Sequence, residues 1–298
     1  MNNPPSALPN VGFIGLGIMG AAMAARLAAA GYPLHVYNRS REKAEPLLAQ
    51  GAQWHDTPAS LAANVQIIVT IVGRPDDVRG IYLGENGLIA HAQPGSILID
   101  MTTSSPELAR ELADQGTQRG VDILDAPVSG GEIGAREGRL SIMVGGHPDV
   151  LTRVEPMLRC LGTNIVLQGG HGAGQHAKLC NQIVIASTML GVCEGLAYAK
   201  RAGLDPSTVL ASIGSGAAGG FLLNNLGPRM ARGDFSAGFF VEHFIKDMGL
   251  AADEAQRMQC ELPGLELVQR LYDELADAGH TRSGTQALFA LYDKDHVK

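Results

Sequence analysis

Short β-branched and aliphatic runs alternate with longer helical patterns over residues 11–168, and no other feature limits the possible fold as much. This alternation is typical of a parallel sheet whose strands are connected by crossover helices. The expected strands are 11–14, 34–38, 66–72, 96–100, 122–126, 141–144 and 164–167, with helices at 19–30, 41–50, 58–63, 106–119 and 148–161. The sequence therefore predicts an α/β fold with a Rossmann-type doubly wound sheet.

Strand patterns end at Gly169, and the rest of the chain is expected to be helical. The expected helices are 175–202, 206–215, 222–231, 239–258, 263–278 and 284–294. We predict three parts: a flexible N-terminal tail (1–10), a Rossmann domain (11–170) and an all-α domain (171–298). The long helix 175–202 joins the two domains and would extend for roughly 42 Å.

Charge and cysteine spacing exclude several classes of protein. A net charge of -7 lacks the positive field that gathers nucleic acid or anionic lipid, so we expect neither as a partner. The apolar stretch 183–199 contains Glu194 and has polar flanks, which favours a buried helix over a membrane span. The cysteines form no CxxC pair, which favours reduced, buried thiols in the cytoplasm; they are Cys160, Cys180, Cys193 and Cys260.

A glycine motif follows the first expected strand and begins the first expected helix. Its six residues are Gly15-Leu16-Gly17-Ile18-Met19-Gly20, and we assign all of them to cofactor binding. In this context Gly15 permits a tight turn, Gly17 lets the backbone approach a pyrophosphate, and Gly20 lets the helix pack closely on the sheet. The motif predicts a dinucleotide site.

The end of the second expected strand bears on the choice of dinucleotide. An acidic residue commonly binds the adenosine 2′-hydroxyl there, but this chain has Asn38, Arg39 and Ser40. A carboxylate would repel a 2′-phosphate, whereas Arg39 can form a charge-assisted contact with it. These residues favour NADP as the cofactor, with NAD as the alternative.

Two polar segments are candidates for a substrate site. The loop after Asp125 ends in Ser129-Gly130-Gly131, whose backbone N–H groups can hold a carboxylate, although the loop can also be a simple turn. Lys178, Asn181 and Gln182 share one face near the start of the long helix, where they either face solvent or line a site.

Several ordered motifs resemble the β-hydroxyacid dehydrogenases, a group that includes 3-hydroxyisobutyrate dehydrogenase. The resemblance covers residues 11–292 and rests on 12–20, Asp100-Met101-Thr102-Thr103, 125–131, Gly172-Ala173-Gly174 with Lys178 and Asn181, and Lys246-Asp247. The pair Asn181-Gln182 looks most similar to the tartronate semialdehyde (2-hydroxy-3-oxopropionate) reductases.

The resemblance implies a role for each matching residue. Lys178 corresponds to the catalytic lysine, Ser129, Gly130 and Gly131 to the loop that binds the substrate carboxylate, and Asn181, beside Gln182, to a substrate contact. The positions that hold the nicotinamide and its ribose are Val72, Gly73, Asp77, Thr102 and Lys246. The chain departs from the family in having Val72-Gly73 where Leu-Pro is frequent, and in lacking the acidic residue near Asn38.

These roles imply an oxidoreductase that moves a hydride between NAD(P) and a small carboxylate substrate. Candidates are tartronate semialdehyde, 3-hydroxyisobutyrate and succinic semialdehyde. A lysine ammonium can stabilise the developing alkoxide and supply its proton. No metal is required, and the nine histidines show no ligand spacing.

Two alternatives use the same scaffold. One is an imine reductase, but such relatives generally have a different residue at the lysine position. The other is a non-catalytic cofactor-binding protein, in which loss of the lysine is expected. Lys178 argues against both.

The long helix also predicts self-association. Beyond Gln182 the helix is apolar on several faces, and one small helical domain can hardly cover all of them. We expect a homodimer or homotetramer; the alternative is a monomer in which helices 222–231 and 239–258 cover it.

Overall fold

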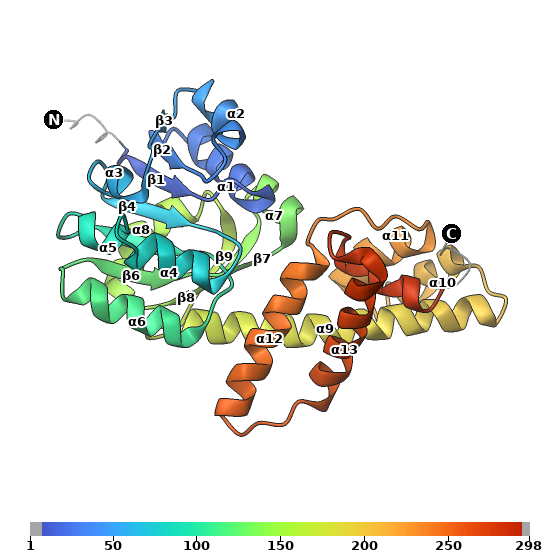
Figure 1. Cartoon of the computed structure of the whole chain (residues 1–298). Coiled ribbons are helices and arrows are strands. Elements are labelled where there is room, and N and C mark those ends of the chain that lie inside the picture. The colour runs from blue at the N-terminus through green and yellow to red at the C-terminus, as the bar shows by residue number, and fades with distance from the viewer. Residues whose placement is uncertain (1–7, 294–298) are drawn as a thin grey trace. The chain divides into compact units, whose positions relative to one another are not determined.

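The computed structural model describes residues 8–293, and the chain divides into two compact units, Met1–Lys178 and Leu179–Lys298 (Figure 1). Most of the tail expected at 1–10 lies outside the described residues, as does the last residue of the helix expected at 284–294.

The first unit is built on one twisted sheet with the strand order β3-β2-β1-β4-β5-β6-β8-β7, and β9 pairs with β8. Strands β1 to β6 run parallel, and the order reverses between β1 and β4, as in a doubly wound sheet. The strands are β1 (Val11–Ile14), β2 (Leu34–Tyr37), β3 (Gln53–Trp54), β4 (Ile67–Thr70), β5 (Ile97–Asp100), β6 (Asp122–Asp125), β7 (Val128–Ser129), β8 (Leu140–Gly145) and β9 (Gly162–Gly169).

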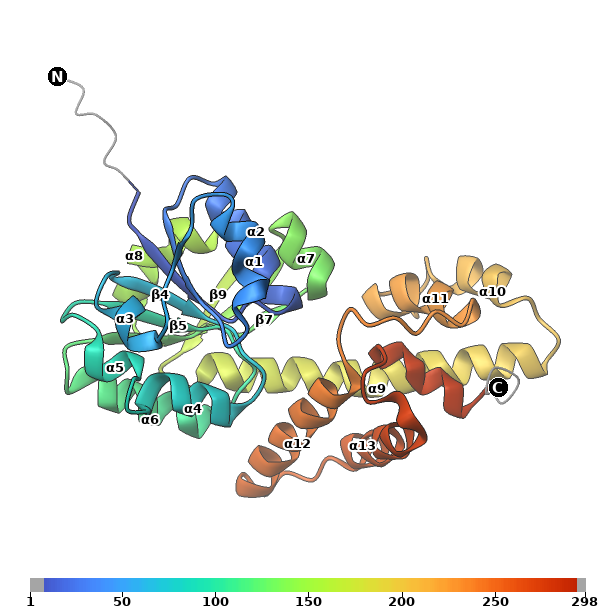
Figure 2. The same ribbon diagram turned by 45° about the horizontal axis from the view of Figure 1, so that its top comes forward.

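Helices cover both faces of this sheet (Figures 1 and 2). Phe13 and Ile14 are neighbours on β1, yet they belong to two different hydrophobic clusters because successive strand residues point to opposite faces. Both are almost fully buried, at 0% and 1% exposed. The covering helices are α1 (Ile18–Ala29), η1 (Arg41–Ala44), α2 (Glu45–Leu48), α3 (Pro58–Ala62), α4 (Pro75–Leu83), α5 (Leu88–His91), α6 (Pro106–Thr117), α7 (Gly131–Glu137) and α8 (Pro148–Leu158).

The predicted fold class is confirmed, but several short elements were not expected. Helix α4 begins at Pro75, and its two buried side chains, Val78 and Tyr82, belong to the hydrophobic cluster on one face of the sheet. Strands β3 and β7 have two residues each, and α7 begins at a glycine pair. Such elements form because tertiary packing outweighs weak local propensity.

The described residues of the second unit form helices joined by loops, with one isolated β-bridge between Phe240 and Gly284. Its helices are α9 (Ala173–Arg201), whose first turns fall in the first unit, α10 (Pro206–Ile213), η2 (Leu222–Leu226), α11 (Gly227–Ala231), α12 (Val241–Arg257), α13 (Pro263–Leu275), η3 (Ala276–His280) and η4 (Thr285–Leu291).

Helix α9 is long and apolar enough, by length and composition, to cross a membrane. In the second unit, however, it packs one face into the hydrophobic core. Met189, Cys193 and Leu196 follow a helical spacing, are at most 2% exposed, and pack with Phe244 and Tyr272. One face of α9 therefore belongs to the core of the second unit, while other apolar residues of the helix, such as Val184, are exposed.

The cysteines correct one expectation. Only Cys193 is buried; Cys160 is half-buried, and Cys180 and Cys260 are exposed. Cys180 lies at an exposed position of α9 although its neighbour Leu179 is buried.

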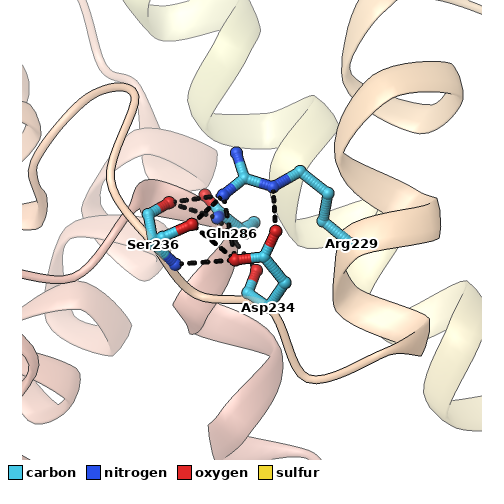
Figure 3. A network of polar contacts seen from close by, with 4 residues as sticks. All are labelled: Arg229, Asp234, Ser236 and Gln286. Carbon is cyan, nitrogen blue, oxygen red and sulfur yellow. Dashed lines mark hydrogen bonds and ion pairs between the residues drawn. The ribbon is translucent and has the colours of Figure 1, made fainter.

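A polar network fixes the segment that leads into α12 (Figure 3). The Arg229 guanidinium donates to both carboxylate oxygens of Asp234 and to the Ser236 carbonyl, and Gln286 donates to the carbonyls of Asp234 and Ser236. The guanidinium holds the pKa of the Asp234 carboxyl well below its usual range.

Candidate active site

The glycine motif forms a turn between β1 and α1 whose geometry fits a pyrophosphate. Gly15 has φ of +96°, and a Cβ there would lie 2.0 Å from the Ile71 carbonyl oxygen. A Cβ on Gly20 would lie 1.9 Å from the Gly15 carbonyl oxygen, so α1 can approach the turn only with glycine here. By contrast, a Cβ on Gly17 would meet nothing within 4 Å, so the backbone at Gly17 faces open space. The three glycines therefore match the three requirements of a dinucleotide turn.

Asn38 stabilises this turn from the end of β2. Its side-chain oxygen accepts the Leu16 N–H at 2.9 Å, and its amide nitrogen donates to the Ser40 carbonyl at 2.8 Å. The neighbouring Arg39 is exposed, which leaves its guanidinium accessible to a ligand. Arg41 lies over the Trp54 ring, 5.2 Å from its centroid.

Beyond β4 and β5, a buried network ties together the segments expected to hold the nicotinamide. Thr102 accepts the Val72 N–H at 3.0 Å, and Asp100 accepts the Thr102 N–H at 3.1 Å and the Thr70 hydroxyl at 2.9 Å. The Tyr82 hydroxyl lies 2.9 Å from that of Thr70. Burial raises the pKa of Asp100 to about 6, against the opposing effect of these hydrogen bonds.

Gly73 and Asp77 lie where β4 leads into α4. The Asp77 carboxylate accepts the Arg74 N–H at 3.1 Å and so caps α4, a structural contact that sequence reasoning did not anticipate. Gly73 is half-buried.

The loop after β6 has the form expected of a carboxylate-binding turn. β7 ends at Ser129, and Gly130 and Gly131 follow with φ of +133° and +62°, conformations that favour glycine. This turn leads directly into α7, so backbone N–H groups at the start of a helix follow Ser129.

Asp125, the last residue of β6, binds the start of α9. Its two carboxylate oxygens accept the Gly172 N–H at 2.8 Å and the Gln175 N–H at 2.9 Å. Burial raises the pKa of Asp125, and these two backbone hydrogen bonds oppose that effect. Lys178 lies one turn further along the helix and is only 7% exposed.

In the second unit, Asn181, Gln182 and Lys246 belong to one chain of polar contacts. The Asn181 side chain donates to the side-chain amide oxygen of Gln182 at 2.8 Å, and the Gln182 side chain donates to the Asp247 carboxylate at 2.5 Å. The other Asp247 oxygen lies 2.9 Å from the Lys246 ammonium nitrogen. Gln182 and Asp247 are each 1% exposed, so Gln182 does not face solvent but is buried with a partner.

Sequence reasoning did not assign roles to four buried polar residues that hold the expected site residues: Asp100, Asp125, Gln175 and Asp247. The two strand-terminal aspartates carried a signal, since each is a charged residue at the end of an apolar run. Asp247 belongs to the Lys246-Asp247 motif, whereas Gln175 carried no signal because its partners are remote in sequence.

A glycine turn at the point where a doubly wound sheet reverses its strand order defines a dinucleotide-binding protein. Residues 10–170 match the family described as the NAD binding domain of 6-phosphogluconate dehydrogenase. Residues 172–292 match a second family, described as the NAD-binding domain of NADP-dependent 3-hydroxyisobutyrate dehydrogenase. The chain belongs to the β-hydroxyacid dehydrogenase family.

Individual relatives match over nearly the whole chain. An uncharacterized oxidoreductase of Bacillus subtilis, YkwC, is 50% identical over 95% of this chain and 99% of its own length. The 2-hydroxy-3-oxopropionate reductase of Escherichia coli is 41% identical over 93% of this chain and 95% of its own. The crystal structure of 3-hydroxyisobutyrate dehydrogenase from Salmonella typhimurium aligns with a TM-score of 0.87 and 27% identity, covering 95% of this chain and 99% of that one.

Proposed function

We propose that this protein is an NADP-dependent oxidoreductase that interconverts a small hydroxy acid and the corresponding semialdehyde acid, with Lys178 as general acid and base. One observation carries the proposal. Lys178 is buried, and its helix is bonded to the strand end from which the Ser129 loop begins. These hydrogen bonds therefore join the segment of the proposed proton donor to the strand that leads into the proposed carboxylate-binding turn.

The residues present fit a nicotinamide dinucleotide. The open space at Gly17 would receive the pyrophosphate, with Leu16, Ile18 and Met19 around it. Val72, Gly73, Asp77, Thr102 and Lys246 are assigned to the nicotinamide side. When bound, the reduced cofactor supplies the hydride.

The preference for NADP rests on the end of β2. Asn38 and Ser40 are uncharged, and Arg39 is exposed beside them. None of these side chains would repel a 2′-phosphate, and Arg39 would pair with it.

Each substrate role follows from residue chemistry. The Ser129-Gly130-Gly131 turn would bind the substrate carboxylate and so direct the carbonyl carbon toward the hydride. The Lys178 ammonium would protonate the carbonyl oxygen during reduction and accept that proton during oxidation. Asn181 would contact the rest of a short polar substrate, and the buried Gln182, bonded to both Asn181 and Asp247, would hold Asn181 in place.

The identity of the substrate is proposed from the relatives. Names such as 2-hydroxy-3-oxopropionate reductase and 3-hydroxyisobutyrate dehydrogenase describe carboxylates of three or four carbons. We place this chain with the semialdehyde reductases because of Asn181-Gln182, and we propose a cytoplasmic location.

The proposal is tested with a panel of substrates, and turnover is measured from the absorbance of the reduced nicotinamide. Three- and four-carbon semialdehydes and hydroxy acids are assayed with NADP(H) and NAD(H), and cyclic imines serve as the competing class. Turnover of a semialdehyde acid that is lost when its carboxylate is replaced by an amide would support the proposal. Turnover of imines alone would refute it.

A further inference from the structure

The first turn of α9 is fastened to the ends of two neighbouring strands. β5 and β6 are parallel, and their last residues, Asp100 and Asp125, lie side by side in register. From β6, Asp125 accepts the N–H groups of Gly172 and Gln175. From the segment after β5, Ser104 donates its N–H to the Gln175 side chain at 2.8 Å, and Gln175 donates to the Thr102 carbonyl at 2.8 Å.

These contacts are shielded from water. Asp125, Thr102 and Ser104 are each 2% exposed, and Gln175 is 0% exposed. A buried polar group is costly to leave unpaired, so each bond resists local opening. The Asp125 carboxylate also lies at the N-terminus of α9, where the helix dipole favours a negative charge.

Gln175 and Lys178 are three residues apart and lie on adjacent positions of the helix surface. Fixing Gln175 therefore fixes the helical turn from which the Lys178 side chain extends. The two strand ends that hold Gln175 are those that lead into the Ser129 turn and into Thr102.

Building on the proposed function, we propose that Asp125 and Gln175 are positioning residues that set the location of the Lys178 ammonium relative to the substrate-carboxylate turn and the nicotinamide segment. Neither contacts the reacting atoms in this proposal. They act through the start of α9, where a displacement of about 1 Å of a catalytic group can cost roughly 100-fold in rate.

Gln175→Met tests this, because methionine has a similar volume and cannot bridge Ser104 and Thr102. Gln286→Met is the matched control. Gln286 is also a buried glutamine, 1% exposed, that bonds to two backbone carbonyls (Figure 3), and it lies outside the proposed catalytic machinery. Both variants should lower the melting temperature.

Only Gln175→Met should change the kinetics. We expect kcat for aldehyde reduction to fall roughly 10- to 100-fold, with little change in the Kd of NADPH. The primary isotope effect with deuterated NADPH should rise, because a misplaced proton donor makes the chemical step more rate-limiting. A loss of stability alone would not raise that isotope effect.

The positioning role is refuted if Gln175→Met keeps the kcat and isotope effect of Gln286→Met. If Gln175→Met does not fold, Asp125→Asn, which is nearly isosteric and loses one acceptor, carries the same test. Lys178→Ala separates the two proposals. Normal turnover of that variant would contradict the proposed function, whereas an inactive Lys178→Ala beside an unaffected Gln175→Met would contradict the positioning role alone.

Discussion

The side-chain oxygen of Asn38 accepts the backbone N–H of Leu16 at 2.9 Å, so the residue that follows β2 holds the glycine turn that follows β1. The same side chain occupies the position where many dinucleotide-binding proteins place a carboxylate. Asn38 stabilises the glycine turn, and we propose that the lack of a charge on its side chain also favours NADP over NAD.

Asn38→Asp should move the cofactor preference toward NAD. The aspartate can still accept the Leu16 N–H that holds the glycine turn. It loses the hydrogen bond that the Asn38 amide donates to the Ser40 carbonyl, and its charge would repel a 2′-phosphate. We expect the Kd of NADPH to rise roughly 10-fold or more, the equivalent of about 1.4 kcal/mol, while that of NADH does not rise. Fluorescence titration with both cofactors checks this. A parallel loss for both would mean that the variant damages the turn.

Arg39→Ala should weaken NADP selectively. A charged hydrogen bond contributes about 1.5–3 kcal/mol, so NADP should bind roughly 10- to 150-fold more weakly and NAD almost unchanged. Arg41→Ala, two residues along in the same segment, is the control, since Arg41 lies over Trp54. Equal weakening of both cofactors in Arg39→Ala would assign Arg39 a structural role.

Lys178→Ala should lower turnover by roughly 10²- to 10⁴-fold, the usual effect of removing a general acid. Cofactor affinity should change little. The control is Lys43→Ala, a substitution of an exposed lysine, which should keep the turnover of the parent protein. Steady-state kinetics with the best semialdehyde of the panel measures the effect. Near-normal turnover would exclude Lys178 as the proton donor.

Asp100→Asn should change how stability depends on pH. Burial raises the pKa of Asp100 in the folded chain to about 6, above its unfolded value near 4, so its contribution to stability is present below pH 4 and is lost as the pH rises through 6. Asparagine can accept the same bonds from Thr70 and Thr102 without ionising. About two pKa units correspond to at most about 3 kcal/mol.

The melting temperature of Asp100→Asn relative to the parent should therefore rise by about 3–10 °C between pH 4.5 and 7.5. Differential scanning calorimetry across that range measures it. The exposed Asp114→Asn on α6 is the control and should show a flat difference. A flat difference for Asp100→Asn as well would contradict the raised pKa.

The protein should assemble into a homodimer or homotetramer. Val184 and Tyr198 on α9 are 65% and 76% exposed, so part of this apolar helix is not covered by its own chain. We expect the interface to bury more than the roughly 1,200–2,000 Å² of a standard protein–protein interface, as obligate homodimers do. Light scattering at low micromolar concentration decides the matter, and a mass of 31.3 kDa for the active protein would contradict assembly.

The sequence by itself determined the elements whose signals are local. Short apolar runs predicted the longer strands of the sheet, though not the two-residue strands β3 and β7. A strand buried on both faces needs consecutive apolar residues, as Phe13 and Ile14 show. The glycine turn was predictable because Gly15 and Gly20 meet steric limits that no other residue satisfies. The long helix 173–201 followed from its length and composition, within two residues at its start and one at its end.

Only the tertiary structure decided how the site residues are held. Short elements such as α4 escaped prediction because their stability comes from burying Val78 and Tyr82 under the sheet rather than from local propensity. The partners of Gln175 and Asp247 lie about 70 residues away, and no pattern along the chain encodes such distances. Folding brings those groups together, and burial then makes each bond costly to break.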